Sequence, residues 1–139
     1  MKLFVFVIMP NHIHIIAHFR EEYPLSDVMR DIKKYTARQI YRQFQAEGYN
    51  KVLEMLKREG EKLKQEYKIW EDDYDARDVF SVKFLQQKMD YIHHNPCQPH
   101  WKLVDKPEQY LWSTAGLYFE GKPCIIPIDL LHKCAIMGT

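Results

Sequence analysis

Cysteine is scarce in this chain, and no apolar run is long enough to cross a bilayer. The cysteines are odd in number and irregularly spaced: Cys97, Cys124 and Cys134. They form no Cys-x-x-Cys pair, so a disulfide framework and a zinc ribbon are excluded, and we expect reduced thiols in a cytoplasmic protein. The apolar residues 1–8 are followed at once by histidines, which favours a strand over a signal peptide.

Net charge is also nearly absent, at +1 over 139 residues. This value is low for a nucleic-acid-binding protein, so the distribution of the charges matters more than their sum. The hydrophobic content of 46% is sufficient for a core. No repeat or low-complexity tract interrupts the chain, and its length fits one domain over residues 1–139.

The most informative segment is Val-Ile-Met-Pro-Asn-His-Ile-His-Ile-Ile-Ala-His, residues 7–18. Because side chains of a strand alternate between faces, His12 and His14 share one side with Ile16 and His18. The apolar set on the other side, which we expect to enter the core, is Ile13, Ile15 and Ala17. Two imidazoles roughly 7 Å apart along a strand can lean onto one cation. The alternative is a solvated strand face that happens to carry histidines.

A second segment, residues 84–96, has an apolar stripe at helical spacing. Pro96 disfavours the α conformation of the residue before it, so the helix should finish at Asn95. Tyr91 and Asn95 are four residues apart and share one face at the C-terminal end of this helix. An amide oxygen is a ligand that hard cations accept. The alternative is a buried aromatic residue and an Asn that caps the helix.

The rest of the chain is expected to form a further strand, two charged helices and an irregular end. Residues 2–8 predict a strand buried on both faces, joined to the strand at 12–18 by a turn. Ser26 is a suitable N-cap for a helix that Gly48 ends or bends. Leucines at helical spacing predict a second helix over 51–67, and 68–80 is expected to be a strand or hairpin arm. After Asn95 we expect loops and one or two short helices.

Together the two chemistry-bearing segments resemble the single-tyrosine HUH transposases. Met9-Pro10-Asn11-His12-Ile13-His14 is similar to their histidine–hydrophobe–histidine block. Tyr91-Ile92-His93-His94-Asn95-Pro96 is similar to their tyrosine block, especially in the REP-associated tyrosine transposase branch. Further similar stretches include Tyr110-Leu111-Trp112-Ser113, so the resemblance runs from about residue 3 to residue 118.

The resemblance implies a fold, an activity and a set of site residues. The fold would be α+β, an antiparallel ferredoxin-like or RRM-like sheet with helices packed on one face. His12, His14 and Asn95 would hold a divalent metal, Mg²⁺ or Mn²⁺, and Tyr91 would be the nucleophile. The enzyme would cleave and rejoin single-stranded or hairpin DNA through a 5′-phosphotyrosine. His93 and His94 are expected to be neither metal ligands nor the nucleophile, and His94 lies nearer the tyrosine face.

A stripe of basic residues on the helix at 26–47 is a candidate DNA surface: Arg30, Lys33, Lys34, Arg38 and Arg42. Tyr35 and Tyr41 lie among them and could stack on bases. A solvated charged face explains the same pattern, and the resemblance to DNA-processing enzymes favours the first interpretation.

Relatives of this kind carry a first strand and a helix that have no counterpart here. We therefore expect an unpaired sheet edge and an uncovered apolar face, which a second copy of the chain would cover as a homodimer. Two other functions stay open. One is a catalytically weak or inactive remnant that still binds structured single-stranded DNA, and the other is a metal-dependent hydrolase in which Tyr91 is structural.

Overall fold

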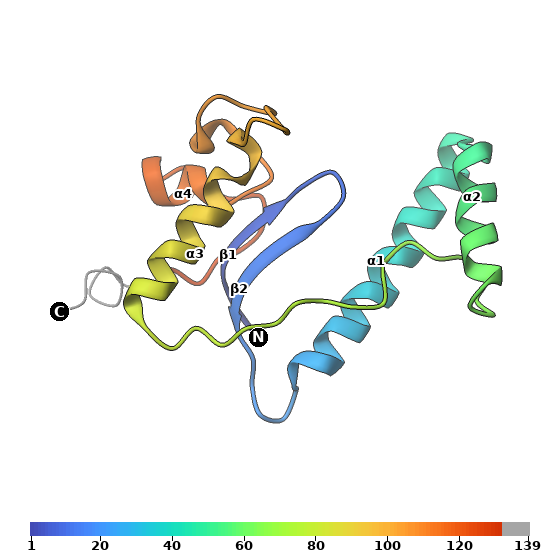
Figure 1. Ribbon diagram of the computed structural model, residues 1–139, viewed down its shortest axis with the longest axis horizontal. Coiled ribbons are helices and arrows are strands. Elements are labelled where there is room, and N and C mark those ends of the chain that lie inside the picture. The colour runs from blue at the N-terminus through green and yellow to red at the C-terminus, as the bar shows by residue number, and fades with distance from the viewer. Residues whose placement is uncertain (132–139) are drawn as a thin grey trace. The chain divides into compact units, whose positions relative to one another are not determined.

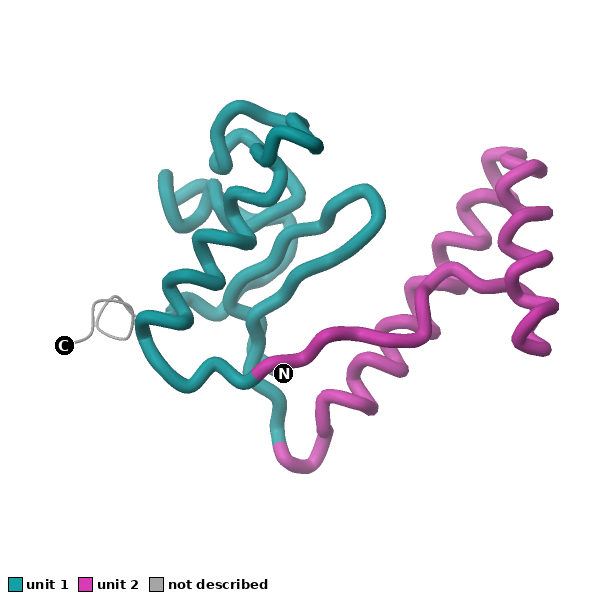
Figure 2. Tube along the Cα trace, viewed as in Figure 1, with its two compact units in different colours: residues 1–20, 78–139 teal, residues 21–77 magenta. Residues whose placement is uncertain are grey.

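The computed structural model describes residues 1–131, so Cys134 lies outside the described residues. The chain forms two compact units (Figures 1 and 2). Unit 1 joins Met1–Arg20 to the chain from Asp78 onwards, and unit 2 is Glu21–Arg77. All four residues proposed from the sequence to carry the chemistry lie in unit 1, whereas the basic stripe lies in unit 2.

The sheet of unit 1 is an antiparallel hairpin of β1 (Lys2–Ile8) and β2 (Ile13–His18). The amide of Met9 donates to the carbonyl of His12 across the turn at 2.8 Å. In the register, Val7 lies opposite His14 and Val5 opposite Ile16, with an irregularity between Leu3 and Val5. The predicted strand–turn–strand is therefore present, and His12 is the last residue before β2.

The helix α3 (Val82–His94) covers one face of this hairpin (Figure 1). It begins at Ser81, whose hydroxyl accepts from the amide of Phe84 at 3.1 Å, a conventional side-chain cap. The core consists of alternate β1 residues, the adjoining Met9 and two residues of α3: Val5, Val7, Met9, Met89 and Ile92.

One prediction about the hairpin holds only in part, since Ile15 and Ala17 are half-buried but Ile13 is not. Ile13 and its strand companions were expected to enter the core, with the histidines on the opposite face. Instead Ile16, on the histidine side, packs against the core, while Ile13 is exposed. The histidines share the face that α3 covers because β1 places Val5 and Val7 on that same face.

The C-terminal part of unit 1 closes the outer edge of β1. It contains three short helices, one more than the one or two expected from the sequence: η1 (Asn95–Cys97), η2 (Pro107–Gln109) and α4 (Ala115–Glu120). The amide of Ile8 donates to Trp112, the amide of Thr114 donates to Phe6, and the amide of Asp129 donates to Leu3. The expected unpaired edge is therefore absent at β1, because the same chain satisfies its backbone groups.

Unit 2 contains two helices, α1 (Leu25–Glu47) and α2 (Asn50–Glu61). Gly48 ends α1 in the left-handed conformation with φ of 75°, as its sequence position predicts. Ser26 is not the cap, since the helix begins at Leu25 and Pro24 occupies the cap position.

The helix α2 is shorter than the predicted 51–67. The chain turns back on itself at Gly60, whose carbonyl accepts from the amides of Leu63 and Gln65. A Cβ at Gly60 would lie 2.6 Å from the Cα of Tyr67, so only glycine permits this approach.

Residues 68–80 form neither a strand nor a hairpin arm. Side chains of α1 hold the first part of this segment instead: Trp70 Nε1 donates to Thr36 Oγ1 at 2.8 Å, and Lys33 binds backbone carbonyls nearby. An extended segment becomes a strand only when another strand pairs with it, and among the described residues none does.

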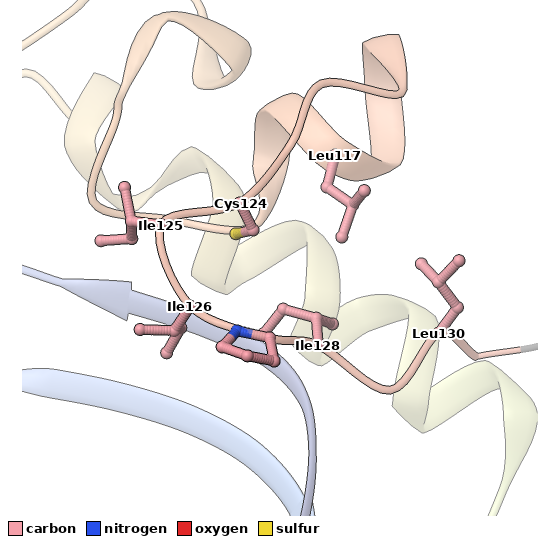
Figure 3. Close-up of a pocket in the computed structure, with 7 residues that line it drawn as sticks. Leu117, Cys124, Ile125, Ile126, Ile128 and Leu130 are labelled. Carbon is pink, nitrogen blue, oxygen red and sulfur yellow. The ribbon is translucent and has the colours of Figure 1, made fainter.

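The architecture is thus α+β, with an antiparallel sheet, as predicted. Within residues 1–131, no helix has the length and apolar character needed to span a membrane. An apolar hollow of about 320 Å³ lies beside α4, lined by Leu117, Cys124, Ile126 and their neighbours (Figure 3). Cys97 and Cys124 are both free thiols.

Candidate functional site

The hairpin brings the imidazoles of His12 and His14 together. Their ring centroids are 4.9 Å apart at an interplanar angle of 74°. His12 Nδ1 lies 2.6 Å from Asn11 Oδ1, and because that oxygen only accepts, Nδ1 carries the proton. The lone pair of His12 is then on Nε2, the arrangement that a neutral imidazole needs in order to bind a metal.

Tyr91 lies beside this pair. Its ring centroid is 5.4 Å from that of His14, although the two residues come from different elements, β2 and α3. The side chain of Tyr91 remains accessible, at 52% exposed. The phenol is thus both open to solvent and adjacent to the histidine pair.

Asn95 continues the face of α3 that carries Tyr91. Phe84, Lys88, Tyr91 and Asn95 follow at intervals of four, three and four residues, which aligns them in one stripe. Asn95 keeps the right-handed helical conformation, with φ of −53° and ψ of −46°, so its relation to Tyr91 is that of one helical turn. Its exposure is only 4%, in contrast to Tyr91.

The electrostatics of the site favour neutral imidazole at His14. Burial lowers its pKa, and the neighbouring His12 and Lys88 lower the pKa further. A neutral ring keeps a lone pair for a metal, whereas a charged ring has none.

The donor set fits a divalent cation of open coordination. Among residues 1–131, no group of three His, Cys, Asp or Glu side chains is placed to hold a metal. The donors expected from the sequence are instead the imidazole nitrogens of His12 and His14, which lie together, and the amide oxygen of Asn95, one helical turn after Tyr91. Neutral ligands of this kind leave the positive charge of the cation available to an anionic substrate.

The two histidines of α3, His93 and His94, differ in environment. His93 is 2% exposed, and its Nε2 is hydrogen bonded to Thr114 Oγ1 at 2.8 Å. Burial, with a contribution from His94, lowers the pKa of His93 to about 4. His94 is exposed, and its Nδ1 lies 2.9 Å from the carbonyl of Asp90. His93 is therefore a structural residue that points away from Tyr91.

Sequence reasoning missed two neighbours of the site. The ring of Trp101 lies 5.8 Å from that of His12, and the ammonium of Lys88 lies 5.9 Å from the centre of the Tyr91 ring. The spacing of three residues between Lys88 and Tyr91 already places this lysine on the tyrosine face of the helix. No sequence signal pointed to Trp101, since a loop brings it back to the hairpin.

In unit 2, the five basic residues of α1 divide into two groups. Arg30 forms ion pairs with Asp27 and Asp31, at 2.9 and 3.1 Å. Lys33 Nζ donates to the carbonyls of three consecutive residues, Glu71, Asp72 and Asp73. These two cations thus have partners within their own unit.

The remaining three, Lys34, Arg38 and Arg42, are exposed. Lys34 also borders a hollow of about 370 Å³ between α1 and the 65–72 segment. Tyr41 is not available to stack on bases, because it is buried and stacks on Tyr67 at 4.0 Å and 5°. Tyr35 is exposed, as its proposed role requires.

The comparison with protein families gives one result. Residues 1–95, which are 95 of the 139 residues, match the family model described as "Transposase IS200 like". The match includes His12, His14, Tyr91 and Asn95. No curated protein and no solved structure matches the chain. Because the family match covers more than half of the sequence, this chain belongs to the IS200-like transposase family.

Proposed function

We propose that this protein is a metal-dependent transposase that cleaves and rejoins single-stranded DNA through a covalent bond to Tyr91. The observation that carries the proposal is the position of the accessible Tyr91 ring, 5.4 Å from His14 and one helical turn before Asn95. The accessible phenol thereby lies beside two imidazoles, and Asn95 lies one helical turn further along the chain.

The reaction is a transesterification at phosphorus. The phenol oxygen of Tyr91 loses its proton and bonds to the phosphorus, and the bond from phosphorus to the 3′-oxygen breaks. The products are a 5′-phosphotyrosine and a strand whose 3′-oxygen takes up a proton. Since the ester energy is kept in the covalent link, attack by a 3′-hydroxyl reverses the step and rejoins DNA without ATP.

The residues around Tyr91 have distinct roles in this proposal. His12, His14 and Asn95 would hold Mg²⁺ or Mn²⁺, which when bound polarises a phosphate oxygen. The backbone of α3 fixes the distance between Tyr91 and Asn95, so the phenol is held close to the phosphate it attacks. Lys88 adds a positive charge beside the Tyr91 ring and favours the approach of a phosphate.

Covalent trapping tests the proposal. Labelled single-stranded oligonucleotides that contain hairpins are incubated with the protein and Mn²⁺, and adducts are separated on a denaturing gel. The unaltered protein should form an adduct, and Tyr91→Phe should form none. Tyr35→Phe is the matched control, because it removes an exposed phenol oxygen from unit 2 and should leave the adduct unchanged.

The other two hypotheses give different results in the same assay. A DNA-binding remnant would retain affinity for the hairpin strand without forming any adduct. A metal-dependent hydrolase would cut DNA without an adduct, and Tyr91→Phe would still cut. Adduct formation by Tyr91→Phe would assign the nucleophile to another residue.

A homodimer is part of the same proposal, and the fold limits how it would form. The outer edge of β1 is covered by residues 112–114 and 129, so a second copy would add at the outer edge of β2, where Ile13 is exposed. Analytical ultracentrifugation checks this. A monomer at micromolar concentration would contradict the dimer but would not affect the proposed chemistry.

A further inference from the structure

An exposed aromatic pair at the start of α3 has no role in the proposed chemistry. The rings of Phe80 and Phe84 are stacked, with centroids 5.5 Å apart and 14° between their planes. Phe80 is 84% exposed, more than any other large hydrophobic side chain of the described residues. An apolar ring in this position contributes little to the core and displays a flat face to solvent.

A lysine connects this pair to the candidate active site. The ammonium of Lys88 lies 5.3 Å from the centre of the Phe84 ring and 5.9 Å from that of Tyr91. Phe80, which precedes α3, and the stripe of α3 described above therefore present, in order, two stacked rings, a cation and the phenol. The aromatic pair is continuous with the site and is not an isolated surface patch.

We propose that Phe80, Phe84 and Lys88 form a binding subsite for one unpaired nucleotide of the DNA strand that Tyr91 attacks. The base stacks on the exposed face of Phe80, and Lys88 contacts a backbone phosphate. The inference rests on the proposed function in one respect only, since Tyr91 defines which strand is bound.

The chemistry of the subsite selects single strands. A base within a duplex has both faces covered by its neighbours, whereas an unpaired base offers a face to a protein ring. Aromatic platforms interleaved with cations are the usual means of holding single strands without reading their sequence. Phe80 supplies the platform, and Phe84 supports it from behind in the stacked arrangement.

The helix also sets the position of the subsite along the strand. Phe84 lies seven positions before Tyr91, which is about 10 Å along a helix axis, and the Phe80 ring lies a further 5.5 Å from that of Phe84. A stacked strand rises about 3.4 Å per nucleotide, so the base on Phe80 would lie at least about three nucleotides from the attacked bond.

Fluorescence anisotropy with a labelled oligothymidylate, in the presence of EDTA, tests the inference. No bond is cut under these conditions, so an inactive Tyr91 would not alter the result. Phe80→Ala should weaken binding about tenfold. Phe80→Tyr should bind like the unaltered protein, and Phe80→Leu should resemble Phe80→Ala, because leucine preserves an apolar contact but cannot stack.

Two controls identify the base and the phosphate as the groups recognised. On a strand of the same length that lacks its bases, Phe80→Ala should bind as well as the unaltered protein. Lys88→Ala should reduce the slope of log affinity against log salt by about 0.7, and Lys88→Arg should preserve it. Leu111→Ala, which truncates another exposed apolar side chain of unit 1, should have no effect.

Three results would overturn the inference. The first is an unchanged affinity of Phe80→Ala for oligothymidylate, given a circular dichroism spectrum that matches the unaltered protein. The second is equal binding by Phe80→Leu and Phe80→Tyr. The third is a Phe80→Ala protein that loses self-association but keeps its DNA affinity, which would assign the aromatic pair to contacts between two copies of the chain.

Discussion

Nε2 of His93 and Oγ1 of Thr114 are joined by a hydrogen bond of 2.8 Å between two fully buried side chains. The same oxygen accepts from the amide of Phe6 at 3.2 Å. One hydroxyl therefore links α3, β1 and the segment that closes the edge of β1. Since Tyr91 lies two residues before His93, the position of the proposed nucleophile depends on this buried network.

The network makes folding sensitive to acid. In the folded chain, burial lowers the pKa of His93 from 6.5 to about 4. As the pH falls, the histidine of the unfolded chain therefore binds a proton before His93 of the folded chain does. The contribution of His93 to the free energy of unfolding is thus complete above pH 6.5 and decreases between pH 6.5 and 4. The full loss is about 3 kcal/mol in the free energy of unfolding. Urea unfolding in EDTA at several pH values measures it.

His93→Gln is the control for this prediction, because glutamine can bond to Thr114 but does not titrate. Other groups of the chain also titrate in acid, so the relevant quantity is the difference in the free energy of unfolding between the unaltered protein and His93→Gln. That difference should change with pH between 6.5 and 5. If both proteins lose stability in parallel over this interval, the assignment to His93 is wrong.

Metal removal should abolish adduct formation, and the histidines should determine whether metal restores it. We expect EDTA to eliminate the adduct and Mn²⁺ to restore it in the unaltered protein. His14→Ala should not be restored, since one of only two imidazole ligands is gone. His18→Ala removes an exposed histidine at the far end of β2 and should behave like the unaltered protein. Restoration of His14→Ala at the same Mn²⁺ concentration would contradict the proposed ligand set.

The basic residues of α1 should contribute unequally to DNA binding. Replacing Lys34, Arg38 and Arg42 together by Ala should lower the affinity for all sequences and reduce the salt slope by about 2, one phosphate contact per residue. Arg30→Ala should change the slope little, because Asp27 and Asp31 already neutralise this guanidinium. Anisotropy titrations at several salt concentrations distinguish the two groups, and equal slopes for all variants would show that the stripe is only a solvated face.

Gly60→Ala should destabilise the protein, although Gly→Ala usually stabilises a helix. In an open position of a helix, Gly→Ala is favourable by about 1 kcal/mol. At Gly60, the added Cβ would meet the backbone of Tyr67 at 2.6 Å, so we expect a net destabilisation of about 2 kcal/mol. Gly116→Ala is the control, since its nearest contact is an ordinary 3.5 Å. Urea midpoints of the two variants measure the difference, and a gain in stability for Gly60→Ala would refute the close approach.

The elements that the sequence predicted best are those with a strong local signal. The hairpin was predicted from alternation and a Pro-Asn turn, and α3 from its apolar stripe and Pro96. The pairing of His12 and His14 required only the strand geometry. Their proximity to Tyr91 could be expected only from the resemblance, because no local pattern predicts which strand α3 covers.

The incorrect predictions have two causes, distant contacts and competition between neighbouring signals. Residues 68–80 have strand-like composition but no partner strand. Tyr41 has the spacing of a surface residue, yet the chain returns after Gly60 and places Tyr67 on its ring. Ser26 is a good cap by type, but Pro24 begins the helix earlier. In each case the outcome depended on a segment far away in the sequence or on competition between neighbouring signals.

The covered edge of β1 has a consequence for the boundaries of the working protein. The family match ends at Asn95, and a fragment cut there would retain every candidate ligand and the proposed nucleophile. It would also lose the partners of Leu3, Phe6 and Ile8, which residues 112–114 and 129 provide. The strand beneath Tyr91 would then be open to addition by any other extended chain. A fragment that keeps this edge covered therefore has to extend to Asp129, well beyond the region by which the family is recognised.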